Sequence, residues 1–327
     1  MTSRTFILGA GFSAVEQFPL VRDLKERVIH FIEDEHHPLY KALLEPGNGG
    51  YPHGRFYDGL NVVDPTGTLG FEEVLISLRR ELENADTFNP CFITKDVLQG
   101  GCARLFWRIH NSIKKISPCY EHFAGWLRRQ TGPEPDAVVS FNWDILVEKA
   151  LWDSPVPWTY SISNAYRVPV LKPHGSINWN GHLREGLPCN YPAWKPLAVG
   201  SQLCFDASNP FSDPDVEEAN PCLRYMLFPG DPDLPNLDSD LKLIWSDIER
   251  AISERDEIIF LGYSMPDYDS FTAQFFKQFY SKNIEVYNPS EEHLERFKTV
   301  FGPSVKLFRQ TFEDSPYGHA PATIASS

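Results

Sequence analysis

The sequence predicts an α/β fold in which a doubly wound parallel sheet carries a helical insertion, and three observations lead to this fold class. Short apolar, β-branched runs over 5–9, 137–141 and 168–172 end abruptly in glycine or polar residues, which is typical of buried parallel strands. Amphipathic stretches with helical spacing lie between strands, and this alternation indicates helices packed on a sheet. The first run passes directly into Gly9-Ala10-Gly11, a turn that joins strand to helix in Rossmann-like folds.

The first half of the chain supplies one strand and then a mostly helical block. Apolar residues recur with helical spacing over 20–35, whereas 45–70 is rich in Gly, Pro, Asp and Tyr and is predicted to be an ordered loop. Amphipathic patterns predict further helices over 71–82, 103–116 and 120–127. We therefore expect residues 1–24 and 131–327 to form a Rossmann-like domain, with 25–130 as a helical insertion or cap.

The second half alternates strands and helices. Strands are expected over 137–141, 168–172, 257–262 and 284–288. Helices are expected over 241–252, 269–280 and 291–300, with Asp267 or Asp269 as N-cap of the second. Residues 180–235 are heavy in Pro, Asn and aromatics and are expected to be irregular, with an extended segment at 223–228; the chain after 314 is expected to fray.

Composition narrows the class of protein. A net charge of −14 over 327 residues argues against a nucleic-acid partner, because neutralising phosphates requires clustered Lys and Arg. No apolar run approaches the roughly 18 residues of a membrane helix, and the N-terminal residues lack the pattern of a signal peptide. These features predict a cytoplasmic protein that binds neither nucleic acid nor membrane.

The cysteines exclude the common zinc and redox motifs. There are six, and the closest two are eleven positions apart, so no C-x-x-C occurs. Scattered cysteines fit a reducing compartment. We expect no bound metal. The six positions are Cys91, Cys102, Cys119, Cys189, Cys204 and Cys222.

The turn after the first strand is the first candidate for ligand binding. Residues 9–14 match G-x-G-x-x-A, in which glycines let the backbone approach a pyrophosphate and a helix N-terminus favours its charge. A tight turn also needs glycine, but the position after the first strand favours a nucleotide. A dehydrogenase would place an acid after a second strand about 20 residues on; residues 31–36 instead continue a helix, so hydride transfer is disfavoured.

Polar side chains follow two further strands. Asn142 and Asp144 come after 137–141, and His174 comes after 168–172, next to Gly175. Singly, each has a structural explanation, since Asn and Asp often satisfy turn amides and a histidine beside glycine can be a packed loop residue. Together with Gly9 and Gly11 of the turn after the first strand, they would meet at one sheet edge, where open α/β sheets bind ligands. The sequence thus predicts a nucleotide site with a base beside it.

These motifs, taken in order, resemble those of sirtuins, and more closely the sirtuin-like domains of bacterial antiphage defence. The resemblance covers about 1–23 and 136–310. The segments that carry it are Gly9-Ala10-Gly11-Phe12-Ser13, Phe141-Asn142-Trp143-Asp144, Pro173-His174-Gly175-Ser176, Gly262-Tyr263-Ser264-Met265-Pro266 with Asp269, and Tyr287-Asn288-Pro289.

The resemblance implies NAD+ binding and a role for each motif. His174 would be the general base, and Asn142 would act with it at the nicotinamide side. Pro19 and Arg22 are similar to a sirtuin segment over the nicotinamide, but Leu20 and Val21 stand where an Asp is expected. The residues implied in binding NAD+ are Gly9, Ala10, Gly11, Phe12, Ser13, Asp144, Gly262, Ser264 and Asn288.

The missing cysteine pairs decide the reaction that the resemblance implies. Sirtuin deacylases hold zinc with two C-x-x-C pairs, and this sequence has none. The remaining chemistry is attack of water on the ribose C1′, for which a neutral imidazole is a suitable base, and a buried carboxylate would stabilise the cationic centre. We therefore expect an NAD+ glycohydrolase, a hydrolase that depletes NAD+ in antiphage defence.

Two other functions stay open. One is a module that senses NAD+ or ADP-ribose without turnover, and the other is a protein deacylase, which the missing cysteines oppose. A defence enzyme that consumes NAD+ must be restrained, so we also expect a homo-oligomer or a partner protein from the same defence system.

Overall fold

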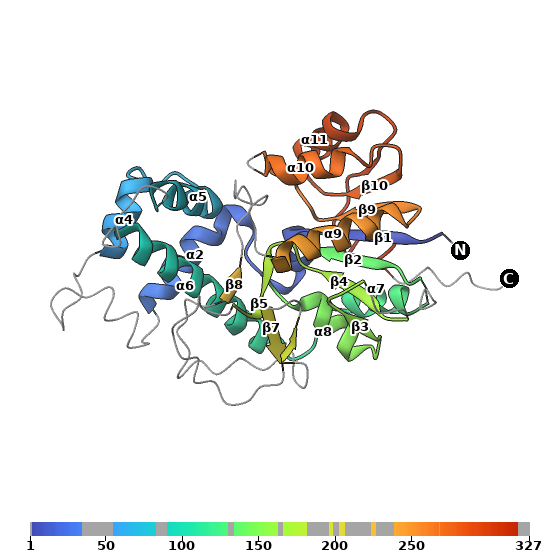
Figure 1. Ribbon diagram of the computed structural model, residues 1–327, viewed down its shortest axis with the longest axis horizontal. Helices are drawn as coiled ribbons and strands as arrows, with labels where there is room; N and C mark the ends of the chain where they lie inside the picture. The colour runs from blue at the N-terminus through green and yellow to red at the C-terminus, as the bar shows by residue number, and fades with distance from the viewer. Residues whose placement is uncertain are drawn as a thin grey trace.

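A computed structural model describes residues 2–34, 55–82, 90–129, 134–162, 166–181, 196–198, 203–206, 224–226, 239–267 and 269–319. Within these residues, the strands of a seven-stranded sheet occupy one side of the molecule and a group of helices occupies the other (Figure 1). A four-stranded sheet lies between the two.

The large sheet is parallel throughout and is built outward from its first strand. Its order is β11-β10-β9-β1-β2-β4-β3, so that β1 lies at the centre with β2 on one side and β9 on the other. This order confirms the predicted doubly wound sheet. The strands that follow β1 in sequence are first added on its β2 side and later on its β9 side. Open α/β sheets bind ligands at the point where the strand order changes sides in this way. The strands are β1 (Arg4–Leu8), β2 (Ala137–Ser140), β3 (Trp158–Thr159), β4 (Val168–Leu171), β9 (Glu257–Leu261), β10 (Asn283–Tyr287) and β11 (Lys306–Phe308).

Helices cover both faces of this sheet, as alternate residues of β1 show. The hydroxyl of Thr5 donates to the carbonyl of Ala251 on one face, whereas the ring of Phe6 contacts Phe123 and Tyr317 on the other. Both residues are fully buried, which explains the continuous apolar run in the sequence. The helices near the sheet are α7 (Pro118–Arg129), α8 (Leu146–Asp153), α9 (Ser239–Ser253), α10 (Ser270–Lys277) and α11 (Glu291–Phe301).

The remaining long helices form the block on the left of Figure 1. They pack chiefly against α6, the longest of them, and the predicted apolar face of α5, from Phe71 to Leu78, is buried. The division of the chain at 25 and 130 stays a prediction; α2 runs across the first boundary, and α7 packs on the sheet. The helices of the block are α2 (Val21–Asp34), α4 (Arg55–Val63), α5 (Phe71–Leu82) and α6 (Pro90–Ser112).

The small sheet is antiparallel and has the order β6-β7-β5-β8. Its strand β8 lies within the segment predicted to be extended at 223–228. Most of 180–235, predicted to be irregular, lies outside the described residues. The four strands are β5 (Gly175–Gly181), β6 (Pro196–Ala198), β7 (Leu203–Asp206) and β8 (Arg224–Met226).

Three local predictions were wrong. The segment 45–70 contains a helix, α4, which buries Phe56 and is tied to α6 by a hydrogen bond from Thr94 to the carbonyl of Phe56. Helix α6 begins at Pro90 rather than near 103. The chain after 314 does not fray before 319, because Ser315 and Tyr317 are buried against the sheet domain. In each case tertiary packing decided the structure against local composition.

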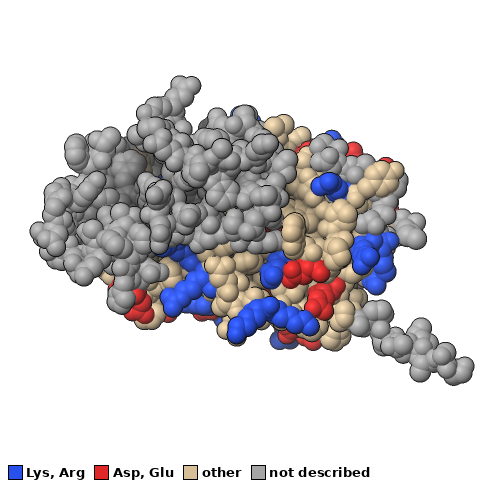
Figure 2. Space-filling model, turned by 90° about the horizontal axis from the view of Figure 1, so that it is seen from below, with Lys and Arg blue, Asp and Glu red and all other residues tan. Residues whose placement is uncertain are grey.

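Surface features add little to the choice of function. Lys and Arg side chains lie close to Asp and Glu on the described part of the face in Figure 2. No helix in the described ranges is long and apolar enough to cross a membrane.

Candidate active site

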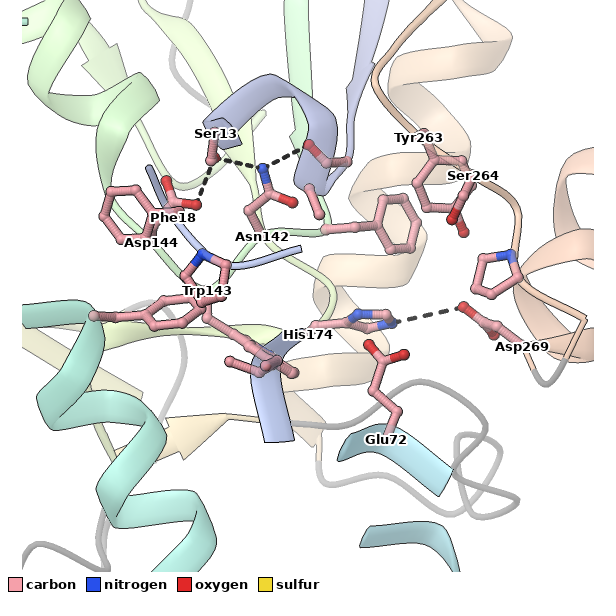
Figure 3. Close-up of a pocket in the computed structure, with 17 residues that line it drawn as sticks. Ser13, Phe18, Glu72, Asn142, Trp143, Asp144, His174, Tyr263, Ser264 and Asp269 are labelled. Carbon is pink, nitrogen blue, oxygen red and sulfur yellow. Dashed lines mark hydrogen bonds and ion pairs between the residues drawn. The ribbon is translucent and has the colours of Figure 1, made fainter. Parts of the chain in front are cut away.

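A pocket lies at the carboxyl edge of the sheet, where β1, β2, β4 and β9 end (Figure 3). Its empty space, including the part open to solvent, is about 680 Å³. The sheet and the helical block both contribute to it. It is lined by Gly9, Ala10, Ser13, Phe18, Pro19, Leu24, Glu72, Phe106, Phe141, Asn142, Trp143, Asp144, His174, Tyr263, Ser264, Pro266 and Asp269.

Glycines allow the turns after β1 and β9 to touch. The Gly9 amide donates to the carbonyl of Leu261 (3.1 Å), and the Gly11 amide donates to the carbonyl of Gly262 (3.0 Å). A Cβ on Gly9 would lie 2.5 Å from the Tyr263 backbone, and Gly262 has φ +63° with Gly11 against it. These glycines therefore serve the close approach of two turns. The short helix that follows, α1 (Ala10–Ser13), is a single turn and is continued by the 3-10 helix η1 (Ala14–Glu16).

A closed hydrogen-bond network forms one wall of the pocket. The side-chain amide of Asn142 donates to the carbonyl of Gly9 and to Oγ of Ser13, both at 2.9 Å. Ser13 in turn donates to Oδ2 of Asp144 at 2.6 Å, and Oδ1 of Asp144 accepts from the amide of Leu146. We call Ser13, Asn142 and Asp144 the bonded wall. It joins the end of β2 to the turn after β1.

A buried ion pair supports this wall from behind. Lys172, directly after β4, is fully buried and pairs with Glu148 of α8 at 3.0 Å. Its ammonium group also donates to the backbone carbonyl of Asp144. Burial raises the pKa of Asp144, and the Lys172 charge and the Ser13 hydrogen bond oppose this rise. The pair fixes the backbone that presents Asn142 and Asp144.

His174 enters the pocket from the tight turn after β4. The amide of Gly175 closes this turn onto the carbonyl of Lys172, and Gly175 has φ +77°, which favours glycine. Burial lowers the pKa of His174, while the charge of Asp269 and a hydrogen bond to the Phe141 carbonyl oppose the shift. Nε2 has no hydrogen-bond partner among the described residues, so the Phe141 contact uses Nδ1. A neutral ring protonated at Nδ1 leaves the Nε2 lone pair free to accept a proton.

Two carboxyl groups face His174 (Figure 3). Asp269 caps α10 by accepting from the amide of Thr272 through Oδ1, and its Oδ2 lies 3.9 Å from Nε2 of His174. Glu72, in the first turn of α5, is 6% exposed. Burial, followed by the charges of Asp269 and Glu73, raises the pKa of Glu72 to about 8. We call His174, Asp269 and Glu72 the open wall.

Seven of the eleven predicted site residues line the pocket: Gly9, Ala10, Ser13, Asn142, Asp144, His174 and Ser264. Gly11 and Gly262 lie behind it at the contact of the two turns. Phe12 packs in the core against Tyr120 and Phe312. Asn288 donates to the carbonyl of Tyr263 and accepts from the amide of Ser290. The functions assigned to all eleven stay predictions.

Sequence reasoning gave no site role to Glu72 or Asp269. Asp269 was predicted as a possible N-cap, which is confirmed, while Asp267 instead pairs with Arg296 at 3.1 Å. Glu72 stands next to Glu73 at the start of a helix, and no local pattern separates the two. Only the docking of α5 buries Glu72 and leaves Glu73 exposed.

The predicted absence of zinc is not tested by the structure. No group of three or more His, Cys, Asp or Glu side chains that could hold a metal occurs in the described part of the chain. However, Cys189 and Cys222 lie outside it.

No family model matches the sequence, and no curated protein matches it. Several solved structures of Sir2 proteins have a similar fold. A mutant Sir2 homologue in complex with ADP ribose is 16% identical, with a TM-score of 0.41 over 95% of this chain and 88% of that chain. A Sir2 enzyme studied for mechanism and regulation is 13% identical, with a TM-score of 0.43 over 96% and 89%. A Sir2 homologue in complex with NAD is 16% identical, with a TM-score of 0.38 over 95% and 85%. Values this low carry no argument about function.

Proposed function

We propose that this protein is an NAD+ glycohydrolase, which cleaves NAD+ with water into nicotinamide and ADP-ribose. The observation that supports it most is that the nucleotide-type turn, Asn142 and His174 line one pocket at the sheet's carboxyl edge. The ordered motifs of the sequence favour NAD+ as the substrate. The pocket contains a buried imidazole whose Nε2 has no hydrogen-bond partner among the described residues and can act as base.

The pocket residues divide the work of this reaction. Ser13 and Asn142 hold the turn after β1 in place for the substrate, and Asp144 supplies negative charge beside the ribose as positive charge develops at C1′. His174 accepts the proton of the attacking water. The aromatic and apolar lining, with Phe18, Phe106 and Phe141, suits the flat nicotinamide ring.

The test is incubation of the purified protein with NAD+ while nicotinamide and ADP-ribose are followed by chromatography. Release of both in equal amounts supports the proposal. Binding of NAD+ without release would favour a sensing module. Acyl transfer from an acetylated peptide, or stoichiometric zinc by elemental analysis, would favour a deacylase.

The biological setting is a second part of the proposal. The motif resemblance supports a cytoplasmic antiphage effector that depletes NAD+ once it assembles with itself or with a partner protein. Turnover per protein molecule should then rise with protein concentration or on adding a partner encoded nearby. Full turnover by a strict monomer would argue against regulated assembly.

A further inference from the structure

Three buried polar atoms of the open wall have no hydrogen-bond partner among the described residues: Nε2 of His174, Oδ2 of Asp269 and Oε2 of Glu72. Their residues are 4%, 1% and 6% exposed and come from three separate elements. All three line the same pocket, and Figure 3 shows the side chains turned toward one another. Buried polar atoms rarely stay unpaired, so this convergence points to a polar ligand.

The spacing fits a small ligand. Nε2 of His174 and Oδ2 of Asp269 are 3.9 Å apart, which is too long for a hydrogen bond and is a separation that one water molecule bridges. A buried water makes about three hydrogen bonds, and the open wall offers three atoms to make them.

We propose that His174, Asp269 and Glu72 bind the water that attacks the ribose, so that the helical block supplies one residue of the water site. The inference rests on the proposed function. The water donates one hydrogen to Nε2 of His174 and the other to the carboxylate of Asp269. It accepts a hydrogen bond from the protonated Glu72 and keeps one lone pair for C1′.

The reaction balances with these groups alone. The water oxygen forms a bond to C1′ as the bond from C1′ to the nicotinamide nitrogen breaks, and the electron pair of that bond stays on the nitrogen. One water proton passes to Nε2 of His174 and then to solvent. NAD+ and water thus give neutral nicotinamide, ADP-ribose and one proton.

Glu72 can donate because it is protonated at neutral pH, its pKa being raised to about 8 by burial and by its acidic neighbours. Above that pH it ionises, the water loses a donor, and turnover falls. The titratable groups around Glu72 are Glu73 on its own helix, Cys102 on α6, His174 after β4, Tyr263 after β9 and Asp269 before α10.

Two substitutions of Glu72 separate a donor from an ionised base. Glu72→Gln keeps a donor at every pH, so it should lose much less kcat at pH 7 than Glu72→Ala does, and its alkaline fall should vanish. Glu72→Ala should lower kcat about 10²-fold, the effect of a misplaced reactant, with little change in KM. Glu81→Gln and Glu81→Ala, at the exposed end of the same helix, are matched controls and should behave as wild type.

The kinetic results can overturn the water site while the glycohydrolase stands. Wild-type kcat and an unchanged pH profile in Glu72→Ala would do so. Loss of activity in Glu72→Gln as large as in Glu72→Ala would also overturn it, because it would make Glu72 an ionised base. Thermal unfolding of each variant identifies a folding failure.

A second measurement decides the matter if the wild type cleaves no NAD+, which would overturn the proposed function. The ring resonances of His174 are followed by NMR between pH 5 and pH 10. In the wild type they should show a second inflection near pH 8 as Glu72 ionises beside them, and Glu72→Gln should lack it. A wild-type curve without that inflection would overturn the cluster itself.

Discussion

The two walls of the pocket differ in how their polar atoms are satisfied. In the bonded wall, Ser13, Asn142 and Asp144 hydrogen-bond to one another and to the backbone. In the open wall, His174, Asp269 and Glu72 each keep one buried atom without a partner among the described residues. Both walls are equally buried, so solvent exposure does not explain the difference.

This difference indicates that the bonded wall stabilises the fold and that the open wall takes part in the reaction. The network of Ser13, Asn142 and Asp144 stabilises the turn that it joins. Buried unpaired atoms lower the stability of the fold and persist where a ligand or a reaction uses them. Substitutions in the bonded wall should therefore lower stability most, and substitutions in the open wall should lower activity most.

The largest effect should come from His174→Ala. Loss of the base should lower NAD+ turnover about 10²- to 10⁴-fold, whereas the free energy of unfolding should fall by only about 1 kcal/mol, because the Phe141 carbonyl loses its hydrogen bond from the ring. Turnover and urea unfolding measure the two quantities. His30→Ala, an exposed histidine on α2, is the control. Turnover at the wild-type rate would remove His174 from the mechanism.

The second effect concerns Glu72 and the stability of the fold. Its pKa rises from 4.5 in the unfolded chain to about 8, so the folded state holds an extra proton between these pH values and loses stability as the pH rises through them. At about 1.4 kcal/mol per pH unit this is on the order of 5 kcal/mol. Glu72→Gln, which carries no charge, should escape this loss.

The measurement is urea unfolding of wild type and Glu72→Gln from pH 5 to pH 8.5. The variant's stability relative to wild type should increase with pH and level off above about pH 8. Groups that do not interact with Glu72 cancel in the difference. A constant difference across this range would mean that Glu72 is ionised in the folded protein at neutral pH.

The contrast between the walls also marks what the sequence could predict. The five inner strands of the large sheet were predictable because continuous runs such as Ile258-Ile259-Phe260 are buried on both sides. The short edge strands β3 and β11 were not predicted. The positions of the bonded wall and of His174 were predictable from the inner strands, because parallel strands bring their carboxyl ends to one edge of the sheet. Helix α4 was not, because its residues 55–63 are helical through packing on α6 rather than through composition.

The rest of the open wall could not be predicted from local sequence. Glu72 belongs to a helix far from the sheet motifs in sequence, and its burial depends on how α5 docks against the pocket. Asp269 was predictable as a cap, since its Oδ1 performs that function. The position of its other oxygen, 3.9 Å from His174, depends on where α10 lies relative to β4.

The third effect should come from Asn142→Ala in the bonded wall. It leaves the Gly9 carbonyl and the Ser13 hydroxyl each without the hydrogen bond from Asn142, and stability should fall by about 1–3 kcal/mol. Turnover should fall as well, because the turn after β1 loses its anchor. Asn283→Ala, whose side chain bonds to Glu257 at the surface, should change stability by less than about 0.5 kcal/mol. A loss for Asn142 no larger than for Asn283 would mean that the bonded wall does not stabilise the fold.

The smallest effect should come from Ser13→Ala. Ser13 accepts from Asn142 and donates to Asp144, so its loss should lower stability by about 1 kcal/mol. Because Ser13 and Asn142 share a hydrogen bond, the double variant should lose less than the sum of the two single losses, by at least about 0.5 kcal/mol. Ser112→Ala, with an exposed hydroxyl bonded to the carbonyl of Ile109, should instead add to Asn142→Ala without coupling. Additive losses for Ser13 and Asn142 would mean that the hydrogen bonds of the bonded wall act independently. The two walls would then differ only in whether their buried polar atoms have partners.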